Sequence, residues 1–342
     1  MRVLMFARYF NPHIGGVERH VSSVASVLCK KGASVTVITE KYDENLSDDE
    51  FLGKVMVLRF DYPKVKFVGL LLIWFKLFSH YLDEIKRADI VHIHDVFIWY
   101  LPFRFLFPNK PVYITFHGYP SFPLSRKAIF YQKVAEKLTG GNICVGSFIE
   151  KWFGTKPSFV IYGGVDFKKF HPVTNEEMIY DAVYLGRLDD QSCFLKYLDA
   201  FKILLKKKLR FKLLVLGDGK YKSKIKESKN LVYKGAVEDP FHFIQKSRFA
   251  FVSGYLSILE ALACKKLVFA MFDDPLKEDY LKMTPFYKSI VVCNSSSELA
   301  RYVEFYTLNP NEAEKKIEPG YKWVKKQTWD RLADTYLTLW KT

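Results

Sequence analysis

Two adjacent glycines follow the first apolar run of the chain. Val3–Ala7 has the character of a buried strand, and Gly15 and Gly16 stand directly before an amphipathic stretch that ends at Lys31. Glycine lets the backbone come close to a ligand, and a helix N-terminus behind it favours an anion. The pair therefore predicts either a phosphate-binding loop or a tight turn that binds nothing.

Histidines stand where two further apolar runs end. His94 ends the run that begins at Ile90, and His117 follows the run Val112–Phe116. An imidazole at the carboxyl end of a strand can donate to a phosphate or polarise a leaving group. A solvated or structural histidine is the alternative at each position. The spacing matches no zinc motif, so we expect no metal here.

A second group of candidate residues lies in the other half of the chain. Arg187 follows the apolar run Ala182–Leu185, where its guanidinium can hold a diphosphate through two hydrogen bonds. Gly217 ends the next run in the same way, or forms a simple turn. Gly254 opens a helical stretch that carries Glu260, a solitary carboxylate among apolar residues. Such a carboxylate needs a partner, which is either a ribose diol or a backbone amide or lysine.

Strands and helices that position these residues alternate along the whole chain. The strands are short unbroken apolar runs, as buried parallel strands are. The pattern starts again after Pro172, which predicts an α/β protein with two doubly wound, Rossmann-like parallel-sheet domains, residues 1–172 and 173–326. We expect the last segment, residues 327–342, to form a helix that packs back on the first domain. Ligands of such domains bind at the carboxyl ends of the strands.

The charge and cysteine content limit the class of protein. There are 52 Lys and Arg against 37 Asp and Glu, a net charge of +15, so a phosphorylated substrate, anionic lipid or nucleic acid is the expected partner. The five cysteines form no C-x-x-C pair, as in a cytosolic protein with reduced thiols. The N-terminus enters a strand at once, so we expect no signal peptide. The longest apolar run, Phe67–Phe75, is nine residues, whereas a membrane-spanning helix needs about 20.

Taken in order, these segments resemble the retaining family-4 glycosyltransferases of GT-B fold. The resemblance covers nearly the whole chain, although the family usually has Asn where Gly163 stands. The motifs that carry it are Pro12–Glu18, Asp89–His94, Thr115–Gly118, Ile161–Asp166, Gly186–Leu188, Gly217–Gly219 and Glu260–Ala263.

The resemblance implies two domains that face a cleft holding a nucleotide-diphosphate sugar as donor. Arg187 would bind the diphosphate, Glu260 the ribose hydroxyls, and His117 would lie near the transferred sugar. It also implies transfer with retention, with no protein nucleophile, no metal and no cofactor beyond the donor. The other residues that it places on the donor side are Gly15, Gly16, Gly186, Gly217, Gly254, Tyr255 and Leu256, and those on the acceptor side are His13 and His94.

The sequence departs from this family at two further positions. Ser192 stands where the family has a lysine, and Ser253 stands where it has the first of two glutamates. A leaving diphosphate needs cationic stabilisation, so we expect another lysine to replace the missing one. Lys196 is favoured because it lies about one helical turn beyond Ser192. Lys265 and Lys266 are the alternatives.

Aromatic and cationic residues alternate in the first half of the chain and suit a lipid headgroup boundary, or else a core. They are Phe67–Phe78 with Lys64, Lys66 and Lys76, and Phe97–Phe105. We therefore predict a cytoplasmic hexosyltransferase of cell-envelope glycan synthesis, peripheral on anionic membrane, with a lipid-linked or polysaccharide acceptor. An inert GT-B subunit that binds a partner or nucleotide is the alternative. Nucleic-acid binding is less expected, because the basic run Lys206–Arg210 ends a helix and no nucleic-acid motif occurs.

Overall fold

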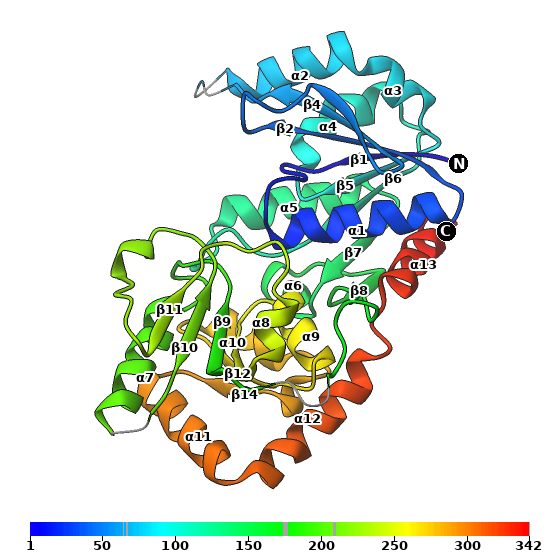
Figure 1. Ribbon diagram of the computed structural model, residues 1–342. Coiled ribbons are helices and arrows are strands. Elements are labelled where there is room, and N and C mark those ends of the chain that lie inside the picture. Colours follow the sequence, from blue (N-terminus) through cyan, green and yellow to red (C-terminus); the bar gives the residue numbers. More distant parts are fainter. Residues whose placement is uncertain (64, 66–67, 174–176, 208–209, 342) are drawn as a thin grey trace. The chain divides into compact units, whose positions relative to one another are not determined.

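The structure is a computed structural model that describes residues 1–63, 65, 68–173, 177–207 and 210–341 (Figure 1). It consists of two compact units, each with its own sheet. Unit 1 comprises Met1–Ile161 and Trp329–Thr342, and unit 2 comprises Tyr162–Thr328. The boundaries predicted at residues 172 and 326 stay predictions.

Unit 1 is built on an eight-stranded sheet in the order β3-β4-β2-β1-β5-β6-β7-β8, in which only β3 is antiparallel to its neighbour. Its central strands are buried along their whole length, which explains their unbroken apolar character. The strands are β1 Arg2–Phe6, β2 Ser34–Lys41, β3 Asp49–Leu52, β4 Val55–Asp61, β5 Ile90–His94, β6 Val112–Phe116, β7 Asn142–Val145 and β8 Phe159–Ile161.

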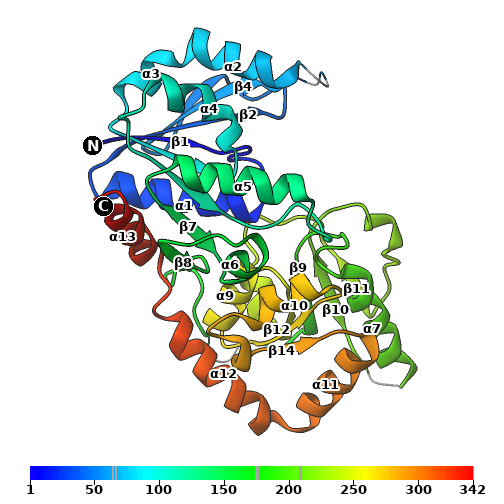
Figure 2. The same cartoon turned by 180° about the vertical axis from the view of Figure 1, so that it is seen from behind.

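Seven helices of the described residues belong to unit 1. They are α1 Gly16–Lys30, α2 Gly69–His80, α3 Leu82–Arg87, α4 Phe97–Leu106, α5 Arg126–Leu138, α6 Phe148–Phe153 and α13 Trp329–Leu339. The last of these, α13, comes from the C-terminal end of the chain and packs against α1, as both views show (Figures 1 and 2). It buries Leu332, Ala333, Tyr336 and Leu339 in unit 1. The aromatic side chains Tyr336 and Trp340 of this C-terminal segment thereby reach Thr115 and His92 in the unit 1 sheet.

Unit 2 contains a six-stranded, fully parallel sheet in the order β11-β10-β9-β12-β13-β14. Aromatic rings fill much of its core: Phe251 lies 5.4 Å from the ring of Tyr197 and 5.7 Å from that of Phe269. This burial accounts for part of the aromatic content of the chain. The strands are β9 Tyr180–Leu185, β10 Leu213–Leu216, β11 Leu231–Tyr233, β12 Ser247–Phe251, β13 Leu267–Met271 and β14 Val291–Cys293.

The helices of unit 2 are α7 Phe194–Lys206, α8 Phe241–Gln245, α9 Tyr255–Ala263, α10 Pro275–Lys282, α11 Ser296–Leu308 and α12 Pro310–Val324. Helices α7 and α11 pack on one another, and α9 packs on α12. The predicted architecture, two α/β domains with open parallel sheets, is confirmed. Within the described residues, no helix has both the length and the apolar character needed to span a membrane.

Candidate active site

Two of the predicted histidines lie together at the carboxyl edge of the unit 1 sheet. Strands β5 and β6 are parallel neighbours, with His94 paired in register to Thr115, so the loops after them are adjacent. The Nδ1 atom of His94 lies 2.9 Å from Nε2 of His117. The backbone N–H of His117 donates to Asp95, which has a left-handed backbone conformation (φ 63°). The turn after β5 thus fixes the loop that carries His117.

The shared proton of this histidine pair can be assigned from its surroundings. Nε2 of His94 is buried and has no hydrogen-bond partner among the described residues. A buried N–H without an acceptor is rarer than a buried acceptor without a donor, so the proton of His94 belongs on Nδ1, from which it donates to His117. His117 then carries its own proton on Nδ1. Burial holds the pKa of both imidazoles well below the ordinary value, so the pair is neutral at neutral pH.

Below this pair, a chain of hydrogen bonds runs through the core of unit 1. The indole N–H of Trp340 can only donate, and it does so to Nδ1 of His92 at 3.0 Å. His92 must therefore donate through Nε2 to the Thr115 hydroxyl, 2.8 Å away. Thr115 and Tyr336 are 3.0 Å apart, and the Tyr336 hydroxyl lies 2.9 Å from Nε2 of His20. Tyr336 of α13 and Trp340, which directly follows this helix, thus contribute two links to the network beneath the candidate site.

The glycine loop before α1 is shaped by an acidic side chain. Gly15 is the residue before the helix, and Glu18 lies in its first turn. A Cβ atom on Gly15 would lie 2.1 Å from the Glu18 carboxylate, so a larger residue would require this side chain to move. The same carboxylate lies 2.8 Å from Nδ1 of His13. At Gly16, by contrast, a Cβ would meet no atom within 4 Å. The loop is therefore open at its second glycine.

In unit 2, Arg187 follows the carboxyl end of β9. Its guanidinium contacts Asp189 at 3.2 Å and Gln191 at 2.6 Å, and 66% of the side chain is exposed. The neighbouring loop after β10 approaches so closely that a Cβ on Gly217 would lie 1.9 Å from the Gly186 carbonyl oxygen. Gly217 also has a positive φ of 141°. The close contact between the two loops and the positive φ therefore explain the glycine at position 217 without a ligand.

The segment after β12 is held by buried hydrogen bonds. The Ser253 hydroxyl accepts from the backbone N–H of Met271 at 3.0 Å. Because the Tyr197 hydroxyl donates to the carbonyl of Phe269, Ser253 donates its own proton to Tyr197 at 2.7 Å. Gly254 then opens α9, and a Cβ there would meet nothing within 4 Å. The turn at Gly254 is therefore free of steric contacts, and hydrogen bonds hold the side chain of the preceding residue, Ser253, in place.

Helix α9 begins with two residues predicted to contact the donor. The ring of Tyr255 stacks on that of Tyr280 at 3.9 Å, and its backbone N–H donates to the Tyr280 hydroxyl. Leu256 packs over Gly163, where a Cβ would lie 2.5 Å from its side chain. Gly163 also has a positive φ of 105°, a backbone conformation that favours glycine at this position of the interdomain motif. Glu260 is 4% exposed and lies about one turn beyond Leu256 on the same helix.

The lysines expected to replace the missing cation all have other contacts. Lys196 donates to the carbonyls of Phe272 and Asn294, at 2.9 and 3.0 Å. Lys265 and Lys266 precede β13, whereas Arg187 follows β9. Since these strands are parallel, the two lysines lie at the opposite edge of the sheet from Arg187. They cannot share a ligand with it.

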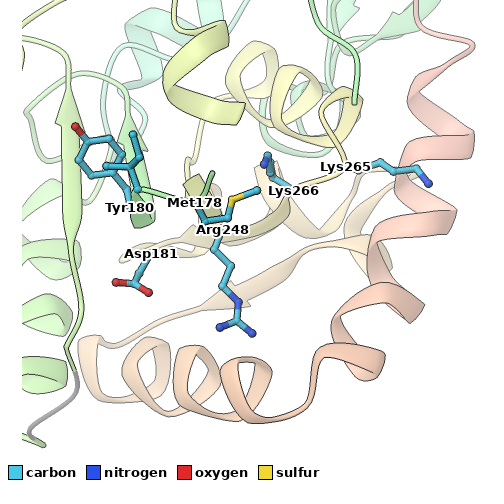
Figure 3. Close-up of a pocket in the computed structure, with 7 residues that line it drawn as sticks. Met178, Tyr180, Asp181, Arg248, Lys265 and Lys266 are labelled. Carbon is cyan, nitrogen blue, oxygen red and sulfur yellow. The ribbon is translucent and has the colours of Figure 1, made fainter. Parts of the chain in front are cut away.

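Lys265 and Lys266 instead line a pocket of about 490 Å³ at that opposite edge (Figure 3). Lys265 extends away from the pocket and pairs with Glu318 of α12. Lys266 donates to the carbonyl of Gln245, and Arg248 to that of Thr307. The pocket therefore does not coincide with the predicted donor residues, and its cations have protein partners. Its lining is Met178, Ile179, Tyr180, Asp181, Arg248, Lys265 and Lys266.

Comparison with known proteins supports this arrangement of two similar domains. Residues 14–169 match the model of Glycosyltransferase Family 4, and residues 166–323 match that of Glycosyl transferases group 1. No curated protein matches the chain by sequence. Among solved structures, sucrose-phosphate synthase from Thermosynechococcus elongatus superposes with a TM-score of 0.76 at 15% identity, covering 99% of this chain and 98% of that one.

Two further structures have the same fold over their whole length. HepE from Anabaena has a TM-score of 0.76 at 13% identity, with 99% of both chains covered. A glycosyltransferase from Rickettsia africae has a TM-score of 0.73 at 17% identity, covering 99% of this chain and 97% of that one. The chain is a GT-B glycosyltransferase. The predicted GT-B fold is thereby confirmed.

Sequence reasoning missed three parts of this glycosyltransferase. It gave no role to Glu18, which lies over the glycine loop, nor to Tyr336 and Trp340, which reach the histidines from the last helix. It also passed over Lys277 of α10, whose side chain is buried beside Ser253. Only Glu18 had a local signal, since it follows the glycine pair within one turn. Across the described part of the chain, no three metal-binding side chains converge on a metal site.

Proposed function

We propose that the protein transfers a hexose-type sugar from a nucleoside diphosphate sugar to a glycan or lipid-linked acceptor, with retention. The observation that carries this proposal is the meeting of Arg187, the open Gly254 turn and the head of α9 at one carboxyl edge of the unit 2 sheet. HepE, which shares the fold, has been solved with UDP and glucose and with UDP-glucose. TarM has been solved with UDP and α-GlcNAc-glycerol.

Arg187, Glu260, the two open glycines and the histidines each have a task in this reaction. Arg187 binds the diphosphate and stabilises the negative charge that grows on it as the glycosidic bond breaks. Glu260 accepts hydrogen bonds from the ribose hydroxyls, and Gly16 and Gly254 let the backbone approach the donor. The acceptor hydroxyl attacks from the face that the diphosphate leaves and gives its proton to the leaving phosphate oxygen. His117, neutral with its proton on Nδ1, donates to a sugar oxygen beside the reacting carbon. His13 lies on the acceptor side, and His94, which is buried, acts there only through its hydrogen bond to His117.

The donor is tested by thermal stabilisation. We expect one nucleotide sugar among UDP-glucose, UDP-N-acetylglucosamine, GDP-mannose and ADP-glucose to raise the stability of the protein by about 2.7 kcal/mol at 100 times its dissociation constant. Turnover is then measured as release of nucleoside diphosphate, and the anomeric configuration of the product by NMR. Binding without turnover on any acceptor would favour the inert-subunit alternative, and no binding at all would refute the proposal.

An exposed apolar face of α2 supports the membrane part of the proposal. Ile73 and Leu77 point into unit 1, whereas Leu71 and Phe75 point outward, Phe75 with 69% of its side chain exposed. Lys76 lies among them. Lys76 also pairs with Asp61 at 3.4 Å, so the support for an anionic lipid surface comes mainly from the exposed apolar side chains. Other large apolar side chains exposed on α2 and at the end of α4 are Leu72, Phe78, Phe105 and Leu106.

The rest of the predicted aromatic region divides between core and undescribed residues. Phe97, Trp99, Tyr100 and Phe103 of α4 are buried, so for this stretch the core interpretation holds. Lys64, Lys66 and Phe67 lie outside the described residues. The proposal of a peripheral protein on the cytoplasmic face of the membrane therefore rests on α2 and on the net charge of +15.

Replacing Phe75 with glutamate should reduce binding to anionic vesicles by about tenfold or more, because burial of one Phe side chain contributes about 1.5–3 kcal/mol. Binding is measured by flotation with phosphatidylglycerol vesicles at low and high salt, and it should fall with salt. Phe130 of α5 is similarly exposed at 63%, and its replacement with glutamate serves as the matched control. Equal losses of vesicle binding in the two variants would contradict the proposal that α2 contacts the membrane.

A further inference from the structure

Lys277 is a buried cation that forms no ion pair with the described acidic side chains. It is 6% exposed, its ammonium donates to the Ser253 carbonyl at 2.7 Å, and it lies 4.0 Å from the centroid of the Tyr280 ring. Among the described residues it has no carboxylate within ion-pair distance and no second hydrogen-bond acceptor. A buried ammonium costs several kcal/mol unless it is well paired. Two of its three hydrogens thus remain for a ligand.

The position of Lys277 in α10 adds to this positive potential. Pro275 is the first residue of the helix, and Asp274 before it accepts a hydrogen bond from the backbone N–H of Lys277. A helix N-terminus carries partial positive charge and disfavours a lysine there. Burial, together with the nearby guanidinium of Arg187, lowers the pKa of Lys277 to about 8. Two sources of positive potential, the helix N-terminus and the Arg187 guanidinium, therefore lie near the Lys277 ammonium, and the carboxylates of Asp274 and Asp189 offset them in part.

The strand order places this lysine at the predicted donor edge. Strand β12 lies between β9 and β13 and is parallel to both. Arg187 follows β9, Ser253 follows β12, and the turn into α10 follows β13. All three loops follow the carboxyl edge of the sheet, so Arg187 and Lys277 are two cations at the same edge. Two cations at one edge attract a ligand with more than one negative charge.

We infer that Lys277 is the second cationic ligand of the donor diphosphate, in the role left vacant by the serine at position 192. This inference rests on the proposed function, which supplies the diphosphate. The expected replacement, Lys196, is less suited because its ammonium already donates to two backbone carbonyls. Lys277 lies on α10, whereas Lys196 lies on α7, and the Lys277 ammonium donates to the Ser253 carbonyl. A buried charge that is costly in the unliganded protein thereby gains a counter-ion when the donor binds.

Replacing Lys277 with methionine tests this inference, because methionine keeps the length and removes the charge. Affinity for UDP, GDP and ADP is measured by calorimetry at pH 7, with the corresponding nucleosides in parallel. We expect the tightest diphosphate to bind about 10- to 100-fold more weakly, as for a lost hydrogen bond from a charged group. Nucleoside binding should not change. The melting temperature without ligand should stay equal or rise, since a buried charge is removed.

Lys282 provides the matched control on the same helix. It is 49% exposed and pairs with Glu278, so Lys282→Met should change neither affinity nor melting temperature. An unchanged diphosphate affinity of K277M would overturn the inference, and a lowered melting temperature with that result would assign Lys277 a structural role. If the parent protein binds no nucleoside diphosphate, the proposed function fails, and the inference with it. The two failures are thus distinguishable.

A measurement on the parent protein needs no substitution. Because Lys277 must be protonated to bind phosphate, affinity for the diphosphate should fall about tenfold between pH 7 and pH 9. The other titratable groups facing it are Cys193, Tyr280, Asp189 and Asp274. Burial raises the pKa of Cys193 to about 12 and that of Tyr280 above its ordinary value, so neither group loses a proton between pH 7 and pH 9. A constant affinity, or the same fall in K277M, would contradict the inference.

Discussion

Replacing Arg187 with alanine should lower the rate of sugar transfer by about two to three orders of magnitude and leave the fold intact. Loss of one preorganised donor to a developing negative charge costs roughly 3–4 kcal/mol in the transition state. The fold should not suffer, because the Arg187 side chain is mostly exposed and its ion pair is with Asp189 at the surface. Exposed pairs of this kind contribute about 1 kcal/mol or less to stability.

The measurement is kcat and KM for the donor identified above, together with the melting temperature. Arg187→Lys should recover part of the rate, since it keeps the charge but not the two-pronged geometry. Arg210→Ala is the control, because Arg210 is also exposed but precedes β10, at the opposite edge of the same sheet. Full activity of Arg187→Ala would show that Arg187 does not bind the donor. An equal loss of rate in Arg210→Ala would indicate a general effect of charge.

Unit 1 should lose stability steeply as the pH falls below 6.5. Burial lowers the pKa of His20 to about 3, and burial with the nearby His20 lowers that of His92 to about 3. In the unfolded chain both imidazoles take up protons near pH 6.5, whereas in the folded unit they stay neutral. Their contribution to stability is therefore complete above pH 6.5 and is lost progressively towards pH 3. Each should cost about 1.4 kcal/mol per pH unit, so the pair lowers the free energy of unfolding by about 3 kcal/mol per unit.

The hydrogen-bond chain gives this expectation a structural basis. His92 cannot take a second proton without losing the bond from Trp340, whose indole N–H only donates. His92→Gln keeps one donor and one acceptor but cannot be protonated, so it should reduce the slope of the free energy of unfolding by about 1.4 kcal/mol per pH unit. The test is urea unfolding of both proteins at pH 7.5, 6.5, 5.5 and 4.5. Equal slopes would show that His92 does not titrate on unfolding, whatever the absolute stability of the variant.

The amino-acid sequence by itself determined the architecture and most positions of the candidate site. Buried parallel strands must be apolar along their length, so the runs Val112–Phe116 and Ala182–Leu185 were visible locally. Residues directly after such runs lie at one edge of a parallel sheet, which is why His117 and Arg187 could be chosen without a structure. The roles of these residues stay predictions. The polar edge strand Asp49–Leu52 was missed, because a strand at the border of a sheet does not need the apolar pattern.

Only the tertiary structure decided which side chains are buried together. Lys277 looks like an ordinary surface lysine of a short helix, and its burial under the Ser253 loop follows from the packing of α10 on the sheet. Tyr336 and Trp340 lie more than 200 residues beyond the groups that they contact, His92 and Thr115. Periodicity and turn motifs report interactions within a few residues of the chain. The cost of burying a charge or a polar atom depends on partners brought from elsewhere, and those are known only once the chain has folded.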